Sequence, residues 1–469
     1  MAKLTKPGSN VVRVASKKTS TTEVSPSVSG VIGTLSCLVE PGKLCKVTSW
    51  NDFKVKCGIL DANDVKDNYL ANAVYSYYLL NSGDFYFVIA EPSQGEGAGA
   101  KATKTVAGLT VTAKTVGKWG NDISVAVKDG VITLKYGSDV EVFASVEDAK
   151  NSYYATITGT AEGDGAETKL AGGTDAVETL TDENVGAAFL ELSKAHDITI
   201  ISVLADDPKY AFALKQQLQN LENEFDRKIA CIVSMDGDPS SPSTMSKIQT
   251  YLEGDVTGNL FFRYAMYYPN VVISNPCGVS NGKLTVPACV VEHAVYGYYA
   301  NEFGVRKSPA GYDSTLPNVT DVTYSLTDPQ IGDYNSNNIN CIIPKASHGI
   351  VNWGARLMQE NQDRKFVSDL LLDNYIETWI KQDTEWATFE SIDGVTQTKL
   401  VARIEAFLSL LWKGGSLKGE EPEQAYFVQC NDDTMKDAQE GQIIIEAGWA
   451  KKVPAEFITT KVIYDATLV

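Results

Sequence analysis

The middle of the chain alternates between short apolar runs and stretches in which apolar residues recur every three or four positions. The runs at 197–204 and 228–235 have the length and composition of buried strands, whereas 182–195 and 208–225 have the spacing of amphipathic helices. Further elements are expected at 243–253 (helix), within 261–274 (strand) and at 287–303 (helix). Strands and helices in this order predict a mainly parallel sheet with right-handed crossovers.

This α/β domain begins upstream, at 30–92, where 67–80 form a Tyr-rich helical stretch and 85–90 form an apolar strand. Its second part spans 178–345. We expect 304–349 to be mostly loop, because Asn, Asp and Thr are frequent there. A connection of that length typically lies across a surface or an interface.

Between the two parts, residues 93–177 are dominated by Gly, Ala, Thr and Val and show no helical period. They predict a small inserted β domain with two-residue hairpin turns at Asp129-Gly130 and Gly137-Ser138. Its strands are expected at 123–127, 131–136 and 140–143. The stretch from Gly95 to Gly99 superficially matches a dinucleotide-binding loop. A β pattern comes after it instead of the helix that such a loop requires, so we interpret it as a linker.

The chain closes on a C-terminal domain at 346–455, flanked in the sequence by an arm at each end of the protein. Its expected elements are helices at 364–381 and 399–412 and strands at 425–430 and 442–447. Residues 1–29 and 456–469 have the pattern of extended arms. The predicted fold class is α/β (α+β overall) and multidomain. It combines a mainly parallel α/β middle domain, a small inserted β domain, and a C-terminal α+β domain with extended N- and C-terminal arms.

Composition narrows the possible partners. The 469-residue chain carries a formal net charge of −18, which argues against binding nucleic acid through its phosphates. No apolar run approaches the ~20 residues of a membrane helix, so we expect no membrane insertion. None of the eight cysteines forms a Cys-x-x-Cys pair, and we interpret them as reduced thiols. The N-terminus has no apolar stretch of signal-peptide length, so we expect assembly in the cytoplasm.

Candidates for chemistry are few. The three histidines, His196, His293 and His348, are accompanied by no nucleophile elbow, Walker loop or metal-ligand spacing. Asp236 and Asp238 come after an apolar strand and could hold Mg²⁺, although a polar turn is the simpler explanation. We therefore assign no catalytic, cofactor-binding or metal residues, and we expect no cofactor and no enzyme. The alternative is a cytoplasmic nucleotide-binding or hydrolytic α/β enzyme that uses these aspartates. A surface or adhesion protein is disfavoured by the missing signal peptide.

Short motifs along nearly the whole chain resemble, in sequence and in order, those of the contractile-tail sheath family. That family comprises the sheaths of contractile-tailed phages, phage-tail-like bacteriocins and related contractile injection systems. The first motifs are Pro7-Gly8, Ser29 to Gly33, Asn72 to Ala90, Gly117 to Asn121 and Ser308 to Gly311. The most specific are Trp353-Gly354-Ala355-Arg356, Phe389-Glu390, Leu411-Trp412 and Pro454-Ala455-Glu456-Phe457. The sequence fits a phage tail, a bacteriocin and an injection system equally.

The resemblance implies a structural subunit that polymerises helically around an inner tube and contracts to drive the tube through a target envelope. Its partners would be other copies of itself, the inner tail tube protein, and baseplate and tail terminator proteins. The sheath would belong to a virion tail or phage-tail-like particle assembled in a bacterial host cytoplasm. Both arms would add a strand to a neighbour's C-terminal domain. The strand-exchange residues would be Val11, Val12, Val14, Phe457, Ile458, Val462 and Tyr464. The tube-facing residues would be Lys413, Lys418, Glu420 and Glu421.

Overall fold

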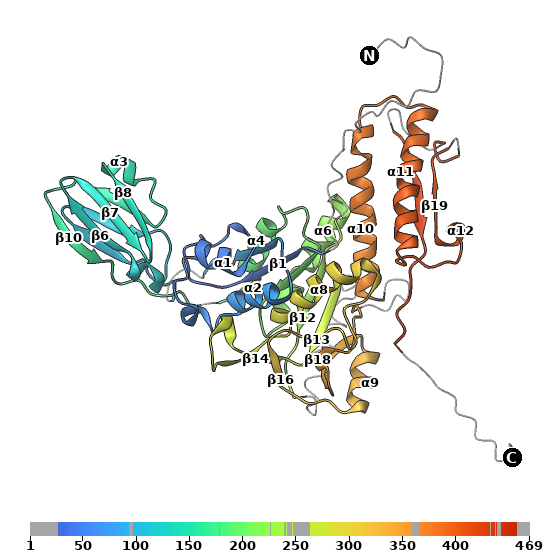
Figure 1. The fold of residues 1–469 in the computed structure, drawn as a ribbon, viewed down its shortest axis with the longest axis horizontal. Helices are drawn as coiled ribbons and strands as arrows, with labels where there is room; N and C mark the ends of the chain where they lie inside the picture. The colour runs from blue at the N-terminus through green and yellow to red at the C-terminus, as the bar shows by residue number, and fades with distance from the viewer. Residues whose placement is uncertain are drawn as a thin grey trace, which may run out of the picture.

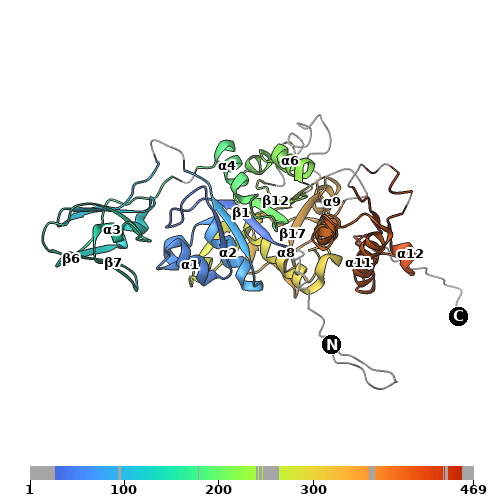
Figure 2. The same ribbon diagram turned by 90° about the horizontal axis from the view of Figure 1, so that it is seen from above.

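The molecule is elongated, with three parts in a row. In the computed structural model a β domain lies at one end, a mixed α/β part in the middle and a pair of long helices at the other end (Figure 1). The same order is seen after a quarter turn (Figure 2). The structure describes residues 27–456 except 93–96, 178, 226, 239–240, 242–245, 247–262, 359–364, 432, 437 and 439–441. The helix expected at 243–253 and both arms therefore lie almost entirely outside the described residues.

An eight-stranded sheet forms the middle part. Its strands, from one edge to the other, are β18 (Gly349–Asn352), β17 (Ile339–Lys345), β13 (Tyr264–Tyr268), β12 (Ala230–Ser234), β11 (Ile200–Val203), β1 (Ser29–Gly33), β3 (Phe85–Ile89) and β2 (Leu44–Val47). The six strands from β17 to β3 are parallel, and the edge strands β18 and β2 are antiparallel to their neighbours. The predicted mainly parallel sheet is confirmed.

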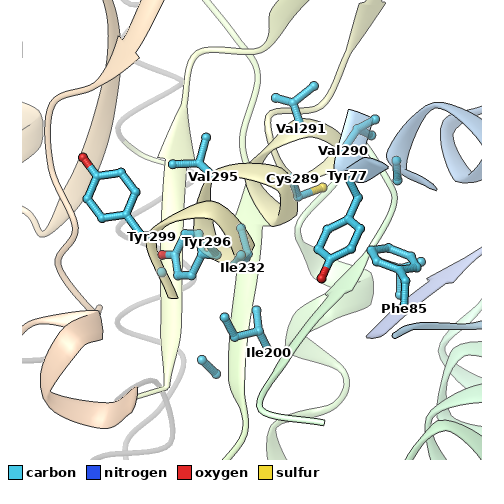
Figure 3. Packing of buried hydrophobic residues seen from close by; sticks show 14 of the residues in the cluster. Tyr77, Phe85, Ile200, Ile232, Cys289, Val290, Val291, Val295, Tyr296 and Tyr299 are labelled. Atoms are coloured by element: carbon cyan, nitrogen blue, oxygen red, sulfur yellow. The ribbon is translucent and has the colours of Figure 1, made fainter. Parts of the chain in front are cut away.

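Helices cover both faces of this sheet, which explains the continuous apolar runs of its strands. One face is covered by α1 (Trp50–Cys57), α2 (Tyr69–Leu80), α8 (Cys289–Phe303) and α10 (Val367–Thr384). The other is covered by α4 (Asp182–Leu192), α5 (Lys209–Phe212), α6 (Lys215–Phe225) and α9 (Asp328–Ser336). Each face packs with its helices into a hydrophobic core. Figure 3 shows the core on the first face, where Val295 and Tyr296 of α8 lie beside Ile200 and Ile232 of the sheet.

The prediction that 304–349 is mostly loop is wrong. This stretch contains the 3₁₀ turn η4 (Gly304–Arg306), strand β16 (Val319–Val322), helix α9 and the buried strand β17. Helix α9 begins at a capping interaction in which the Thr327 N–H donates to Gln330 Oε1 at 3.0 Å, and Pro329 lies in its first turn. Asn337 caps the end of α9 and Asn338 lies in the turn that leads to β17, whereas Asp333 and Asn340 lie within these two elements.

The inserted β domain is built from two sheets over one core. One sheet has the order β10 (Gly165–Lys169), β6 (Ser124–Lys128), β7 (Val131–Tyr136) and β8 (Asp139–Phe143), and the other has β4 (Thr103–Val106), β5 (Leu109–Ala113) and β9 (Ala155–Gly159). Short helical segments are η2 (Lys118–Asp122) and α3 (Val146–Ala149). Asp129 and Gly130 have φ of 51° and 78° between β6 and β7, as the predicted hairpin turn requires.

A three-stranded sheet of β15 (Lys283–Val286), β14 (Val271–Ser274) and β16 adjoins the middle part. Two further 3₁₀ turns are η1 (Ala62–Val65) and η3 (Pro276–Gly278). The last part of the chain contains α10, η6 (Glu385–Ala387), α11 (Gly394–Lys413), α12 (Pro422–Ala425), β19 (Tyr426–Gln429) and β20 (Glu446–Trp449). None of the helices in the described ranges combines the length and the apolar character needed to cross a membrane.

Helices α10 and α11 form an antiparallel pair that rises from the sheet (Figure 1). The apolar face expected on α11 is observed, since Leu400, Ile404 and Leu408 are buried. Trp379 of α10 and Phe407 of α11 stack with ring centroids 3.9 Å apart. These apolar residues of α10 and α11 belong to the same core as α1, α2 and α8, on one face of the sheet. The helix pair is therefore packed continuously onto the middle part.

Candidate functional site

The small sheet of β19 and β20 is the feature most suited to assembly. Its two antiparallel strands have four residues each, and no third strand among the described residues pairs with it. Tyr426 and Val428 turn towards α11 and are half-buried, whereas Phe427 is 56% exposed on the other face. An isolated two-stranded sheet is marginally stable, and a free edge is a template for another strand. Just beyond β20, Lys418 N donates to the Ala450 carbonyl at 2.9 Å. Along the strands themselves, the sheet has room for a further strand at each outer edge.

Helix α10 ties the end of this sheet to the rest of the molecule through Asp373. The Asp373 carboxylate, whose side chain is 6% exposed, accepts a hydrogen bond from Trp449 Nε1 at 2.9 Å and pairs with Lys451 Nζ at 2.5 Å. One turn along α10, Glu377 pairs with Lys228 Nζ, also at 2.5 Å, next to the start of β12. Spacing by four residues places both carboxylates on one face of the helix. This one face of α10 is thus joined both to β20 and to the start of β12 in the main sheet.

Beyond Lys451, the chain is held a second time by a clasp between Arg356 and Glu456. Arg356 Nε and Nη2 donate to the two carboxylate oxygens of Glu456, each at 2.6 Å. Arg356 Nη1 donates to the backbone oxygen of Asn335, and Lys365 Nζ lies 3.5 Å from Glu456 Oε2. The Arg356 side chain is 6% exposed and that of Glu456 is 20% exposed. A paired guanidinium fork in this setting fixes both distance and direction.

The backbone around Arg356 is itself fixed. Asn340 of β17 accepts from the Arg356 N–H at 2.6 Å through Oδ1 and donates to the Arg356 carbonyl at 2.9 Å through Nδ2. Met358 N donates to the Tyr264 carbonyl of β13 at 2.7 Å. The segment around the arginine is therefore bonded to β17 and β13 of the eight-stranded sheet, so a force applied to Glu456 is transmitted to that sheet.

A buried carboxyl group, that of Glu292, is bonded to Asn352 at the end of β18. Asn352 Nδ2 donates to Glu292 Oε2 of α8 at 2.7 Å, and Glu292 has no exposed surface. Burial raises the pKa of Glu292 to about 8, against a lowering effect of the Asn352 hydrogen bond. The neighbouring His293 is equally buried, its Nε2 lies 2.8 Å from Ser202 Oγ, and burial lowers its pKa to about 3. Both groups are therefore neutral at pH 7.

The residues predicted for assembly fall in two groups. Those of the arms, Val11, Val12, Val14, Phe457, Ile458, Val462 and Tyr464, lie outside the described residues. Those predicted to face a tube, Lys413, Lys418, Glu420 and Glu421, are all exposed around the turn from α11 to α12. Their roles stay predictions.

The candidates for chemistry are dispersed. Asp236 is exposed at the carboxyl end of β12 and accepts from Thr323 Oγ1 at 3.5 Å. The His348 ring lies tilted against that of Tyr312, with ring centroids 4.4 Å apart. In the part of the chain that the structure describes, no three His, Cys, Asp or Glu side chains are grouped so that they could hold a metal ion.

The structure adds residues that sequence reasoning missed, namely Asp373, Lys451 and Asn340. Arg356 and Glu456 both lie within motifs visible in the sequence, and their opposite charges were the available signal that the motifs meet. Asp373 carried no such signal, because carboxylates are common on helix surfaces and its partner Lys451 is 78 residues away. Asn340 lies in the stretch that the sequence predicted to be loop.

Comparison with known proteins places this arrangement in a recognisable fold. A chain in the cryo-EM structure of the anti-feeding prophage baseplate matches with a TM-score of 0.62 and 21% identity, over 99% of this chain and 100% of that one. A chain of the contracted sheath complex of an extracellular contractile injection system, PVC, matches with 0.61, 19% identity and 99% coverage of both chains. The sheath tail protein Lin1278 from Listeria innocua matches with 0.64 and 15% identity, over 91% and 95% of the two chains.

No protein-family model matches this chain, and no curated protein sequence does either. The chain nevertheless has the fold of sheath tail proteins over nearly its full length. The predicted resemblance and the α/β, multidomain fold class are confirmed at the level of fold.

Proposed function

We propose that this protein is a structural subunit of a contractile sheath, which polymerises helically around an inner tube and contracts to drive the tube through a target envelope. The observation that carries the proposal is the β19–β20 sheet, which has only two strands among the described residues, in a chain with the sheath fold. A head-to-tail contact that does not close into a ring generates a helical polymer.

Strand exchange is the contact that we propose. The N-terminal arm of one neighbour and the C-terminal arm of another add to the free edges of β19 and β20, with Val11, Val12 and Val14 in the first arm and Phe457, Ile458, Val462 and Tyr464 in the second. Main-chain hydrogen bonds supply most of the affinity in such β-augmentation. Subunits joined this way can change their packing during contraction without separating.

The remaining partners belong to the same proposal. An inner tail tube protein contacts the exposed turn that carries Lys413, Lys418, Glu420 and Glu421, and a baseplate and a terminator close the two ends of the sheath. The similarity to a chain in a baseplate structure supports the baseplate contact. The particle is a phage tail or a phage-tail-like injection device, assembled in the cytoplasm of a bacterial host, and the subunit itself is not an enzyme.

Truncation tests this proposal. We expect the purified full chain to form hollow tubes or long polymers in negative-stain electron microscopy. Chains that lack residues 1–16 or 457–469 are expected to stay monomeric in sedimentation velocity while their circular dichroism stays that of the full chain. If both truncated chains polymerise like the full chain, strand exchange is wrong.

A further inference from the structure

We propose that the Arg356–Glu456 clasp is the joint that orients the C-terminal arm and ties it to the main sheet of its own subunit. The inference rests on the proposed function and adds a positioning role for two named side chains. Glu456 is the first residue of the arm, so the clasp determines where the arm leaves the subunit. Arg356 belongs to the segment that comes after edge strand β18.

Two anchors hold the segment that leads into the arm. Lys451 is held by Asp373 of α10, and Glu456 is held by Arg356, so residues 452–455 are fixed at both ends. Pro454 lies between the anchors and restricts the backbone further, because its ring fixes φ. The first anchor stabilises the two-stranded sheet of the subunit itself. The second lies beyond that sheet, at Glu456, where the arm begins, so it is placed to direct the arm as well as to neutralise the buried Arg356.

The chemistry of the clasp suits an oriented joint. Two parallel bonds of 2.6 Å fix the plane of the Glu456 carboxylate, and a third bond from Nη1 to the Asn335 carbonyl prevents the guanidinium from rotating. A lysine at position 356 would keep the charge and lose the fork, so it would hold Glu456 without fixing its direction. Asn340 immobilises the Arg356 backbone through two further bonds.

A fixed start makes donation of the arm less costly. If the clasp opens, residues 452–456 become free, and each must be ordered again when the arm pairs with a neighbour. Preorganised segments bind more tightly because this cost has been met in advance. We expect the concentration at which polymers first form to rise at least about tenfold when the clasp is lost, which corresponds to reordering only one or two residues.

The experiment compares three clasp variants with one matched control in the full chain. Glu456→Gln keeps an acceptor and removes the charge, and Arg356→Lys keeps the charge and removes the fork. Arg356→Met combined with Glu456→Met replaces the pair by apolar side chains, so that no charge stays buried and unpaired. The control is Arg403→Gln, which breaks another forked pair, with Asp383, between α11 and α10.

Each protein is examined for the concentration at which it polymerises and for hydrogen exchange of residues 450–456 in the monomer. The inference predicts that the clasp variants fold, exchange faster at 450–456 and polymerise only at tenfold or higher concentration, whereas the control polymerises like the parent chain. Normal polymerisation of the double Met variant overturns the inference.

A chain without residues 457–469 separates the two claims. If that chain stays monomeric while the clasp variants polymerise normally, the clasp inference fails and the proposed function survives. If the truncated chain polymerises normally, the proposed strand exchange fails first.

Discussion

The buried carboxyl group of Glu292 makes the stability of this protein depend on pH in a direction that can be predicted. Glu292 has no exposed surface, and its carboxyl group accepts a hydrogen bond from the Asn352 amide. The informative change is Glu292→Gln, which keeps the size and an acceptor oxygen for Asn352 and removes the titration.

The magnitude is set by the displaced pKa. The pKa of Glu292 is about 8 in the folded protein against an ordinary 4.5. Between these pH values the unfolded chain loses its proton while the folded protein keeps it, so raising the pH favours unfolding. At about 1.4 kcal/mol per unit, the folded state loses roughly 5 kcal/mol relative to the Gln variant between pH 4.5 and 8. At low pH the variant is expected to be slightly less stable, by about 1 kcal/mol, because one amide donor gains no partner.

Urea unfolding of both proteins at half-unit steps from pH 5 to 9 checks this prediction. The two free energies of unfolding should cross close to pH 5, where the parent has lost the ~1 kcal/mol by which the variant starts lower. The variant should be the more stable protein at higher pH. Glu302→Gln serves as the control, since Glu302 is exposed on the same helix, α8. A difference between parent and Glu292→Gln that stays constant within about 1 kcal/mol over this range would show that Glu292 ionises normally, contrary to the reasoning.

Three further predictions use the same kind of measurement. His293→Gln should remove the loss of stability that His293 causes in the parent as the pH falls from 6.5 towards 3. The folded state holds His293 neutral while the unfolded chain binds a proton. Urea unfolding at pH 4 and 7 checks this prediction. Asp373→Asn should lower the free energy of unfolding by about 2–3 kcal/mol, because Trp449 and Lys451 lose a charged acceptor. The Trp449 side chain should also become more accessible to a fluorescence quencher. Unchanged stability and quenching would contradict the role of Asp373 as an anchor. Phe389→Gly should raise the free energy of unfolding by about 0.5–1 kcal/mol, as measured by thermal unfolding. Phe389 is fully exposed and has a φ of +71°, a strained value for residues with a side chain. Phe389→Ala, which keeps the strain, is the control.

The sequence was sufficient for the elements with strong periodicity. The apolar runs of β11, β12 and β3 and the broad apolar faces of α10 and α11 required only local pattern, and the Asp129-Gly130 turn required only its two residues. Helix α9 and strand β17 were missed because the stretch that contains them is rich in Asn and Asp, a composition typical of loops.

The joints of the candidate site could not be predicted, since they depend on pairs far apart in the chain. Arg356 and Glu456 are 100 residues apart and Asp373 and Lys451 are 78 apart. Nothing in the local sequence of either partner specifies the other. The fold brings these pairs together because α10 packs on the same face of the sheet as α8, and the chain returns past α10 after β20.

A helical reconstruction of the polymer tests the central claim most directly, because it shows which strands flank β19 and β20. We predict that in every subunit this two-stranded sheet gains one strand from each of two neighbours, one contributed by residues before Ser27 and the other by residues after Glu456. A polymer in which the sheet stays two-stranded, or is completed by the two ends of its own chain, would contradict the account.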